Sequence, residues 1–343
     1  MSDAWTEHGG WKCTRNSQGV VAYPGEKMGK RIAVTGASGF LGRHVMPILQ
    51  ERYGAGNVLG MSSRDYDLMD PGQVRQMFAE QKPEILVHLA AYSGGIGANR
   101  TFPADFYYRN TLLTALVFQE AARSGVTRLV YPMGGCSYPA DARSPIDESQ
   151  MWEGFPQVDS AAYATAKKMG IVAGMAYQQQ YGLSSVIIVP GNMYGEHDNF
   201  RTEEAHVIPA LIRRFFEAKR DAAQEVVVWG TGRSVRDFVY AGDVAATIPY
   251  FIEESQSVGP VNISSGTWTS IKDLAEMIGS ETGYEGAIRW DTSQSDGQMV
   301  KVFDTAKMRS LGLACQTSLL VGIRKTIRWF ERNYDSGADG IRL

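Results

Sequence analysis

RIAVTGASGFLG, residues 31–42, decides the fold of this chain of 343 residues. A short apolar run leads into a glycine-rich turn, and apolar side chains then recur at helical spacing from Leu41 onward. The glycines Gly36, Gly39 and Gly42 permit a tight turn, a close approach of the backbone to a pyrophosphate, and close packing of helix on strand. Strand, turn and helix in this order predict a dinucleotide-binding unit with the phosphates at the helix N-terminus.

The stretch VLGMSSRDYDLMD, residues 58–70, bears on which dinucleotide binds. An NAD-binding unit usually has an acidic residue about 20 residues after the turn, where it holds the ribose 2′-hydroxyl. Here Ser62, Ser63 and Arg64 come first, and an arginine suits a 2′-phosphate. The segment therefore favours NADP, while the neighbouring Asp65 keeps NAD open.

Further segments alternate between the two periodicities. Residues 84–91, 127–132 and 183–192 are apolar runs typical of buried strands, and residues 110–125 and 163–181 have the pattern of helices. Strands that alternate with helices predict an α/β protein with a Rossmann-type, doubly wound parallel sheet. The chain is also longer than one hydrophobic core usually supports, so we expect a second, smaller lobe.

Composition narrows the classes of function. With 34 basic and 37 acidic residues the net charge is −3, which does not favour a nucleic-acid partner. No apolar run approaches the roughly 20 residues that span a bilayer, and residues 1–29 lack the apolar region of a secretory signal. The three cysteines lie far apart without CxxC spacing, so neither a metal site nor a disulfide framework is indicated. We expect a cytoplasmic protein without a membrane partner.

YATAK, residues 163–167, begins the second long helix. Tyr163 and Lys167 are four residues apart and therefore share one helix face. A neighbouring ammonium favours the phenolate and lowers the pKa of a tyrosine, which would make Tyr163 a proton donor or acceptor. After a glycine-rich nucleotide turn, this pair predicts reductase chemistry.

Together these motifs resemble the extended short-chain dehydrogenase/reductase family, also called the NAD-dependent epimerase/dehydratases. Within it the chain looks most similar to the GDP-L-fucose synthases, over residues 31 to about 312. Besides the turn and YATAK, the segments that carry this closer resemblance are HLAAYSGGIGANRTFPADFYYRN (88–110), YGEHDNF (194–200), AHVIPALIRRF (205–215) and VVVWGTGRSVRDFVYAGDVA (226–245). The resemblance implies a 3,5-epimerase/4-reductase that acts on a GDP-4-keto-6-deoxyhexose with NADPH.

The resemblance also implies roles for single residues. Tyr163 would protonate the sugar O4 as hydride arrives at C4, and Lys167 would bind the nicotinamide ribose. Cys136 and His206 match the acid–base pair for epimerisation, because a thiol and an imidazole can be tuned near neutral pH. Without that resemblance, an inert buried thiol would be the favoured explanation of Cys136, and a hydrogen-bonded structural histidine that of His206. The cofactor contacts expected are Gly36, Ser38, Gly39, Phe40, Leu41, Gly42, Arg64, Asp67, Leu68, Ala90, Ala91, Tyr163, Lys167 and Pro190.

For the GDP-sugar, the resemblance implies six contact residues: Gly134, Asn192, Arg214, Trp229, Arg236 and Lys301. The planar fork of an arginine suits a pyrophosphate. WDTSQSDGQMVKVFD, residues 290–304, departs from the family pattern DTTKPDGTPRKLLD, although Lys301 is retained. Which sugar and which base bind is therefore left open.

Domain limits and assembly follow from the same comparison. We expect an N-terminal arm (1–29), an NADP-binding domain (30–192 with about 238–267) and a sugar-nucleotide-binding lobe (193–237 and 268–343). Related enzymes pair through the two long helices, so the resemblance implies a homodimer.

One departure concerns the chemistry itself. The family has approximately GSSCIYP where this chain has MGGCSYP, so Gly134 stands where a serine would bind the C4 oxygen of the sugar. Loss of one such donor typically lowers the rate about 10²–10³-fold. The chain could use another donor such as Ser93, with Ser137 less favoured because it faces the other side of the strand. It could instead have a weak reductase step or a different sugar, or be a catalytically silent NADP-binding protein.

Overall fold

The computed structural model describes residues 14–15, 21–22, 29–201, 204–253 and 259–335. Most of the expected N-terminal arm lies outside these ranges. Its described parts, β1 (Thr14–Arg15) and β2 (Val21–Ala22), pair as a short antiparallel ladder. Within the described ranges, no helix has the length and apolar character that a bilayer crossing requires.

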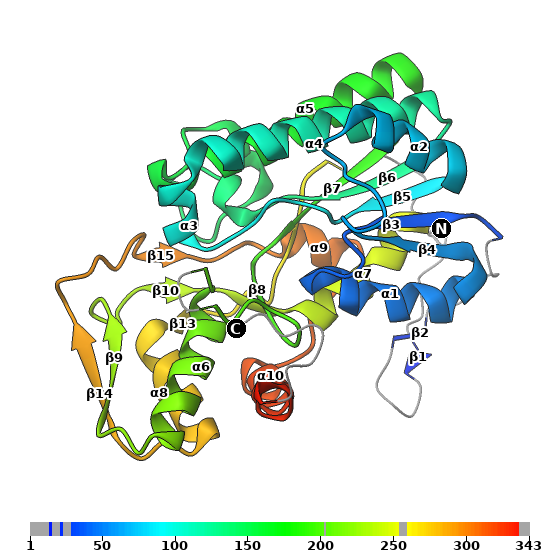
Figure 1. Ribbon diagram of the computed structural model, residues 1–343. Helices are drawn as coiled ribbons and strands as arrows, with labels where there is room; N and C mark the ends of the chain where they lie inside the picture. The colour runs from blue at the N-terminus through cyan, green and yellow to red at the C-terminus, as the bar shows by residue number, and fades with distance from the viewer. Residues whose placement is uncertain (1–13, 16–20, 23–28, 202–203, 254–258, 336–343) are drawn as a thin grey trace, which may run out of the picture.

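Among the described residues, six strands form one parallel sheet in the order β12-β7-β6-β5-β3-β4 (Figure 1). Their interiors are apolar on both sides of the strand, because helices cover both faces of the sheet. The predicted doubly wound parallel sheet is thereby confirmed. The strands are β3 (Ile32–Thr35), β4 (Val58–Met61), β5 (Ile85–His88), β6 (Arg128–Pro132), β7 (Ser184–Pro190) and β12 (Val261–Ile263).

Two layers of helices enclose this sheet (Figure 1). On one face pack α1 (Phe40–Tyr53) and α7 (Ala241–Glu253), and on the other α2 (Pro71–Gln81), α4 (Pro103–Arg123) and α5 (Ala161–Tyr181). A short helix, α3 (Ile96–Thr101), precedes α4. The sequence predicts a start for α4 near Asn110, but the helix begins at Pro103, because proline has a suitable φ for the first helical position.

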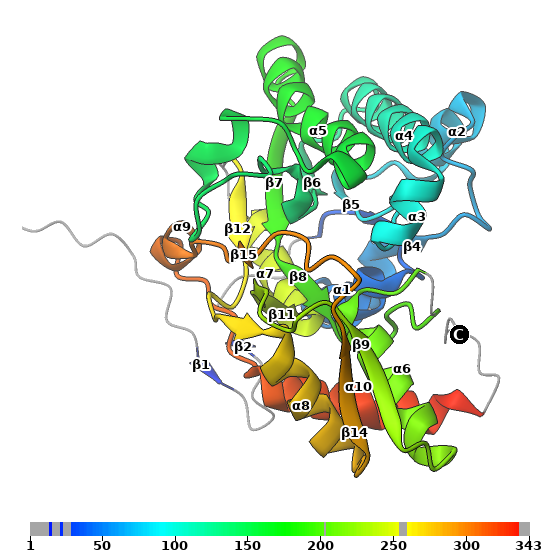
Figure 2. The same cartoon turned by 90° about the vertical axis from the view of Figure 1, so that its left-hand side faces the viewer.

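The smaller lobe has its own core, built on elements that come before α7 and after β12 in sequence. Figure 2 shows it at the opposite end of the molecule from α4 and α5. Its main elements are β8 (Asn192–Tyr194), α6 (Val207–Arg220), β9 (Glu225–Trp229), β11 (Phe238–Tyr240), α8 (Ile271–Thr282), β14 (Ala287–Asp291) and α10 (Leu319–Tyr334). Between the lobes lie β10 (Val235–Arg236), β13 (Thr269–Ser270) and β15 (Val300–Lys301). Helix α9 (Ala306–Ser310) packs beside β12 and places Met308 in the core on the α1 face of the sheet.

The chain crosses between the two parts more than once. It leaves the sheet after β7, and returns to it with α7 on the α1 face and β12 beside β7. Strand β10 then pairs with both β13 and β15, which joins segments far apart in sequence. This arrangement brings the carboxyl ends of β3 and β6 toward the smaller lobe, while the exact domain limits stay a prediction.

Candidate active site

The turn after β3 is shaped by its glycines. Gly36 has a φ of +71°, and a Cβ placed there would lie 2.7 Å from the backbone nitrogen of Ala90. A Cβ on Gly42 would collide with the carbonyl oxygen of Gly36, and the Gly39 N–H donates to that same oxygen at 2.9 Å. Main-chain atoms leave no room for side chains at Gly36 and Gly42, so glycine is required by the backbone itself.

The start of α1 fits an anion. Gly39 is the N-cap residue and provides no side-chain cap, and the first turn contains no acidic residue. Backbone N–H groups at such a helix start are available to phosphate oxygens, and the helix dipole favours negative charge there. Ser38, Phe40 and Leu41 lie on this turn, which therefore fits the pyrophosphate of a dinucleotide.

The other expected cofactor residues lie at the ends of neighbouring strands. Ala90 and Ala91 follow β5, where the Ala90 N–H donates to Thr35 Oγ1 at 3.4 Å. Pro190 is buried as the last residue of β7. Because the carboxyl ends of parallel strands share one edge of a sheet, these residues lie along the same edge as the glycine turn.

In the segment after β4, the side chains of Arg64 and Asp65 have different surroundings. Both the N–H and the hydroxyl of Ser62 donate to Asp65 Oδ2, at 2.7 and 2.8 Å, and these bonds lower the pKa of that carboxyl. Asp65 thus holds its own turn, while Arg64 is exposed. Farther along, Asp67 accepts the Met69 N–H at 2.9 Å and Leu68 packs partly against the core.

Tyr163 and Lys167 lie in the first turns of α5. Lys167 is buried, and its Nζ is 3.9 Å from the ring centroid of Tyr131. That ring stacks on His88 at 5.9 Å, and the Tyr131 hydroxyl is 2.7 Å from Thr114 Oγ1. Since Thr114 already donates to Asn110 O, it accepts from the tyrosine, which fixes the ring beneath the ammonium.

The expected lowering of the Tyr163 pKa by Lys167 is wrong for this structure. Burial raises the pKa of Tyr163, and the Cys136 and Tyr131 side chains raise it further. Burial likewise lowers the pKa of Lys167 to about 7. The physical reason is that Lys167 is buried and Tyr163 is half-buried, and that Lys167 lies over Tyr131.

A short 3-10 turn, Gly135–Ser137, follows β6 and faces Tyr163. A Cβ built on Gly134 would lie 3.0 Å from Cys136 Sγ, 3.2 Å from Tyr163 Cε1 and 3.8 Å from Tyr163 Oη. The position aligned with the missing serine therefore does border the tyrosine. At Gly135, by contrast, a Cβ would collide with the ring of the buried Phe303.

Cys136 lies among cationic groups. Burial raises the pKa of its thiol, while the charges of Lys301 and Lys167 act in the opposite direction. Burial also lowers the pKa of Lys301, which Cys136 counteracts and Arg236 reinforces. The structure thus brings Cys136, Tyr163, Lys167 and Lys301 together beside Gly134.

His206 is exposed as the N-cap residue of α6. The segment before it pairs with the loop after β5, where the Gly95 N–H donates to Glu204 O at 2.9 Å. Val207, the next residue, lines a pocket of the smaller lobe. His206 accordingly lies at the edge of this pocket.

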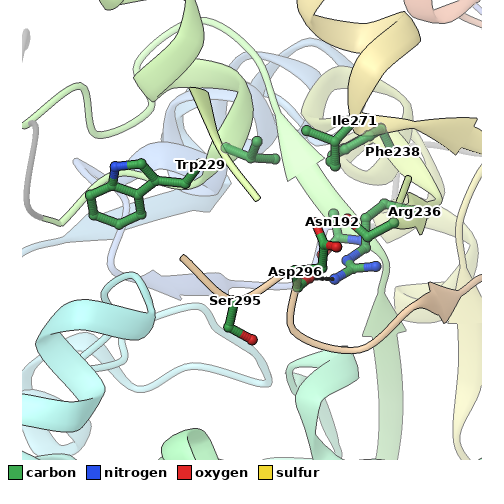
Figure 3. Close-up of a pocket in the computed structure, with 9 residues that line it drawn as sticks. Asn192, Trp229, Arg236, Phe238, Ile271, Ser295 and Asp296 are labelled. Carbon is green, nitrogen blue, oxygen red and sulfur yellow. Dashed lines mark hydrogen bonds between the residues drawn. The ribbon is translucent and has the colours of Figure 1, made fainter. Parts of the chain in front are cut away.

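That pocket has a volume of about 200 Å³ and contains three of the six expected sugar-nucleotide contacts (Figure 3). Its lining residues are Asn192, Val207, Trp229, Ser234, Arg236, Phe238, Ile271, Ser295 and Asp296. Trp229 is 61% exposed and lies across the opening from Arg236. The Arg214 guanidinium is 5.7 Å from the Trp229 ring centroid, so it borders the same opening.

Sequence reasoning missed the loop that closes one side of the pocket. Asp296 accepts both the N–H and the hydroxyl of Thr231, at 2.7 and 2.6 Å, and Arg236 Nη2 donates to Asp296 O at 3.4 Å. Asp296 lies in the segment that departs from the family pattern, and a charged residue retained there was the available signal. Ser93, the alternative donor, is exposed in the loop before α3.

Known proteins resemble this chain over most of its length. Residues 32–264 match the model of the NAD dependent epimerase/dehydratase family. GDP-L-fucose synthase 1 of Arabidopsis thaliana is 37% identical over 303 residues, which cover 88% of this chain and 94% of the relative. The Escherichia coli K12 GDP-L-fucose synthase is 34% identical over 317 residues, with 89% and 98% covered.

A solved structure shares the same fold. A GDP-L-fucose synthetase from Naegleria fowleri, bound to NADP, superposes with a TM-score of 0.81 at 28% identity and covers 92% of this chain and 96% of its own. A GDP-6-OMe-4-keto-L-xylo-heptose reductase from Campylobacter jejuni gives a TM-score of 0.83 at 26% identity, with 90% and 100% covered. With its glycine turn, its YATAK helix and these matches, the chain belongs to the NAD dependent epimerase/dehydratase family.

Proposed function

We propose that this protein is an NADPH-dependent 3,5-epimerase/4-reductase of a GDP-4-keto-6-deoxyhexose. The observation that carries the proposal is the gathering of Cys136, Tyr163 and Lys167 at the end of β6, on the sheet edge that holds the glycine turn. The names of the Arabidopsis thaliana and Escherichia coli relatives support the same activity.

In the reductase step, Tyr163 donates its proton to O4 of the sugar. Burial raises the pKa of the phenol, so Tyr163 is protonated at neutral pH and ready to donate. When bound, NADPH supplies the hydride that goes to C4. Lys167 is placed four residues on, where its ammonium would bind the nicotinamide ribose.

In the epimerase step, Cys136 and His206 exchange protons at C3 and C5. The 4-keto group acidifies both carbons, so one group removes a proton and the other returns one on the opposite face. Lys301 and Lys167 favour the thiolate that a Cys136 base requires, against the opposing effect of burial.

The GDP moiety is proposed to occupy the pocket of the smaller lobe. Trp229 offers an exposed ring to a base, and Arg214, Arg236 and Asn192 surround the opening where a pyrophosphate would lie. The volume of about 200 Å³ fits one part of such a ligand, with the sugar extending toward Gly134 and Lys301.

NADP is proposed over NAD. Asp65, the acidic residue that would hold a ribose 2′-hydroxyl, is engaged by Ser62, and Arg64 is exposed to receive a 2′-phosphate. The uncapped start of α1 serves the pyrophosphate of either dinucleotide.

A homodimer through α4 and α5 is part of the proposal. These two helices lie side by side. Each carries apolar or aromatic residues that are 40% or more exposed. The residues concerned are Tyr107, Tyr108, Met169, Val172, Met175 and Tyr181. A patch of this kind fits an interface between subunits. We also propose a cytoplasmic location, since a reduced thiol at Cys136 is needed for the chemistry.

One observation favours a second function. Gly134 provides no hydroxyl to the C4 oxygen, so a nucleotide-sugar 3,5-epimerase with little or no reductase step is the alternative.

The test incubates the protein with GDP-4-keto-6-deoxymannose in deuterium oxide, with and without NADPH. NADPH absorbance reports reduction, and mass spectrometry reports deuterium at C3 and C5. We expect both signals. Deuterium without NADPH consumption would replace the proposal by the epimerase alternative, and NADPH binding with neither signal would overturn both activities on this substrate.

A further inference from the structure

Glycine at position 134 is not dictated by its backbone. The residue has φ −83° and ψ 145°, an extended conformation that any amino acid adopts. Serine is thus compatible with the main chain here, so the neighbouring side chains are the groups to compare.

Those side chains border the place where a serine would lie. The three atoms nearest to a Cβ on Gly134 belong to Cys136 and Tyr163, with Cys136 Sγ the closest at 3.0 Å. A real Cβ would require the thiol and the tyrosine ring to shift by a few tenths of an ångström, so the glycine adds little space for a larger sugar. It lets the thiol approach Tyr163.

We propose, on the basis of the proposed function, that the Cys136 thiol replaces the missing serine as the second hydrogen-bond donor to the C4 oxygen of the sugar. Tyr163 gives its proton to O4 while the hydride and its electron pair arrive at C4, and the S–H bond of Cys136 stays intact. The thiol thereby serves reduction as well as epimerisation.

The state of the thiol suits this role. Burial raises its pKa, so the protonated form that can donate is present at neutral pH. A thiol is a weak donor toward a neutral acceptor, but hydrogen bonds to a charged oxygen are roughly twice as strong. The developing charge on O4 is such an acceptor.

The other hydroxyl of this turn is engaged. Ser137 donates its hydroxyl to Ala164 O at 3.1 Å, which turns it toward α5. Position 135 cannot carry a hydroxyl while Phe303 packs against it. Ser93 is exposed in another loop.

The test exchanges the two donors. We expect Cys136→Ala to lower the rate of NADPH consumption at least about 100-fold, the loss typical of a missing oxyanion donor. Gly134→Ser alone should not lower it, because the serine adds the hydroxyl donor that the family strand has at this position beside the same cysteine. The double variant Gly134→Ser/Cys136→Ala should recover most of the rate of reduction but none of the deuterium exchange at C3 and C5.

The matched control is Gly134→Ala/Cys136→Ala, which adds the same Cβ without a hydroxyl and should recover nothing. Normal NADPH binding by each variant shows that it is folded. The proposal is overturned if Cys136→Ala consumes NADPH at the wild-type rate, or if the serine gives no recovery beyond the alanine control.

A second measurement needs no sugar, and so separates this proposal from the proposed function. The pH dependence of Cys136 alkylation by iodoacetamide is followed by peptide mass spectrometry, with Cys315 as the internal comparison. In Gly134→Ser, a serine hydroxyl beside the thiolate should shift the midpoint of the pH dependence of Cys136 alkylation to lower pH. An unchanged midpoint would mean that the thiol does not share the serine position, whatever the wild-type enzyme does with the substrate.

Discussion

Two glycines end two strands of the same sheet, and they are glycine for different reasons. Gly36, after β3, has a positive φ and meets the main chain of Ala90. Gly134, after β6, has an ordinary extended backbone and meets only side chains, those of Cys136 and Tyr163. The fold and phosphate binding require the first glycine, whereas the second affects only the side chains that carry out the reaction.

The difference extends to the surroundings of each turn. Around Gly36 the backbone presents N–H groups, which need no ionisable side chain to bind phosphate. Around Gly134 the chain gathers one buried lysine and a half-buried lysine, tyrosine and thiol, whose pKa values are all displaced. Perturbed groups of this kind gather where a reaction is carried out.

Tyr163→Phe should have the largest effect at the Gly134 end. The variant removes the proton donor to O4, so NADPH consumption should fall about 10²–10⁴-fold. NADPH affinity and deuterium exchange at C3 and C5 should change little, because they depend on other groups. Fluorescence titration and the deuterium assay check this, and unchanged NADPH consumption would mean that Gly134 does not border the reacting centre.

Lys167 should make stability depend on pH. Burial lowers its pKa in the folded protein to about 7, while an unfolded lysine titrates near 10.4. Between these values the unfolded chain binds the extra proton, so the free energy of unfolding rises with pH. Relative to Lys167→Met, the wild-type value should rise from about pH 7 to about pH 9, approaching about 1.4 kcal/mol per pH unit, and be flat below about pH 6.

Urea unfolding of both proteins across this range provides the measurement. Lys272→Met, which removes an exposed lysine, is the control and should leave the slope unchanged. A parallel pH dependence of wild type and Lys167→Met would contradict the burial of the ammonium beside Gly134.

The two turns also show what a sequence can predict. The sheet and the Gly36 turn were predictable because periodicity and a glycine triplet report main-chain requirements, which one chain reveals by itself. That Gly134 borders Tyr163 followed from alignment with the family strand. The approach of Cys136 Sγ and the Phe303 ring in front of Gly135 were not predictable, since they join segments far apart in sequence.

The prediction of a lowered Tyr163 pKa was wrong for the same reason. Spacing placed Lys167 on the face of Tyr163, but burial and the position of the ammonium over Tyr131 decide the pKa values, and neither is visible in the sequence. Asp296 was missed because its partner Thr231 lies in a different segment.

Alanine substitutions at Gly36 and at Gly134 test directly whether the two turns need glycine for different reasons. Gly36→Ala should lower the free energy of unfolding by about 1–3 kcal/mol, since alanine must adopt a left-handed conformation and its Cβ meets backbone that cannot move aside. NADPH affinity should fall with it. Gly134→Ala should destabilise the fold by less than about 1 kcal/mol and leave NADPH affinity nearly unchanged, because only side chains have to shift. Equal losses in urea unfolding would remove the distinction between the two turns.

Arg64→Ala should have the smallest effect and should be confined to the Gly36 end. Arg64 is exposed after β4, where a contact with the 2′-phosphate would be partly screened by water. We expect NADPH to bind about tenfold more weakly, a loss of about 1.4 kcal/mol, while NADH affinity stays the same. Asp65→Asn is the matched control, because it alters the same turn without touching the cation. If NADPH and NADH affinities fall together in Arg64→Ala, the arginine supports the turn rather than the phosphate, and the preference for NADP must come from elsewhere along the sheet edge.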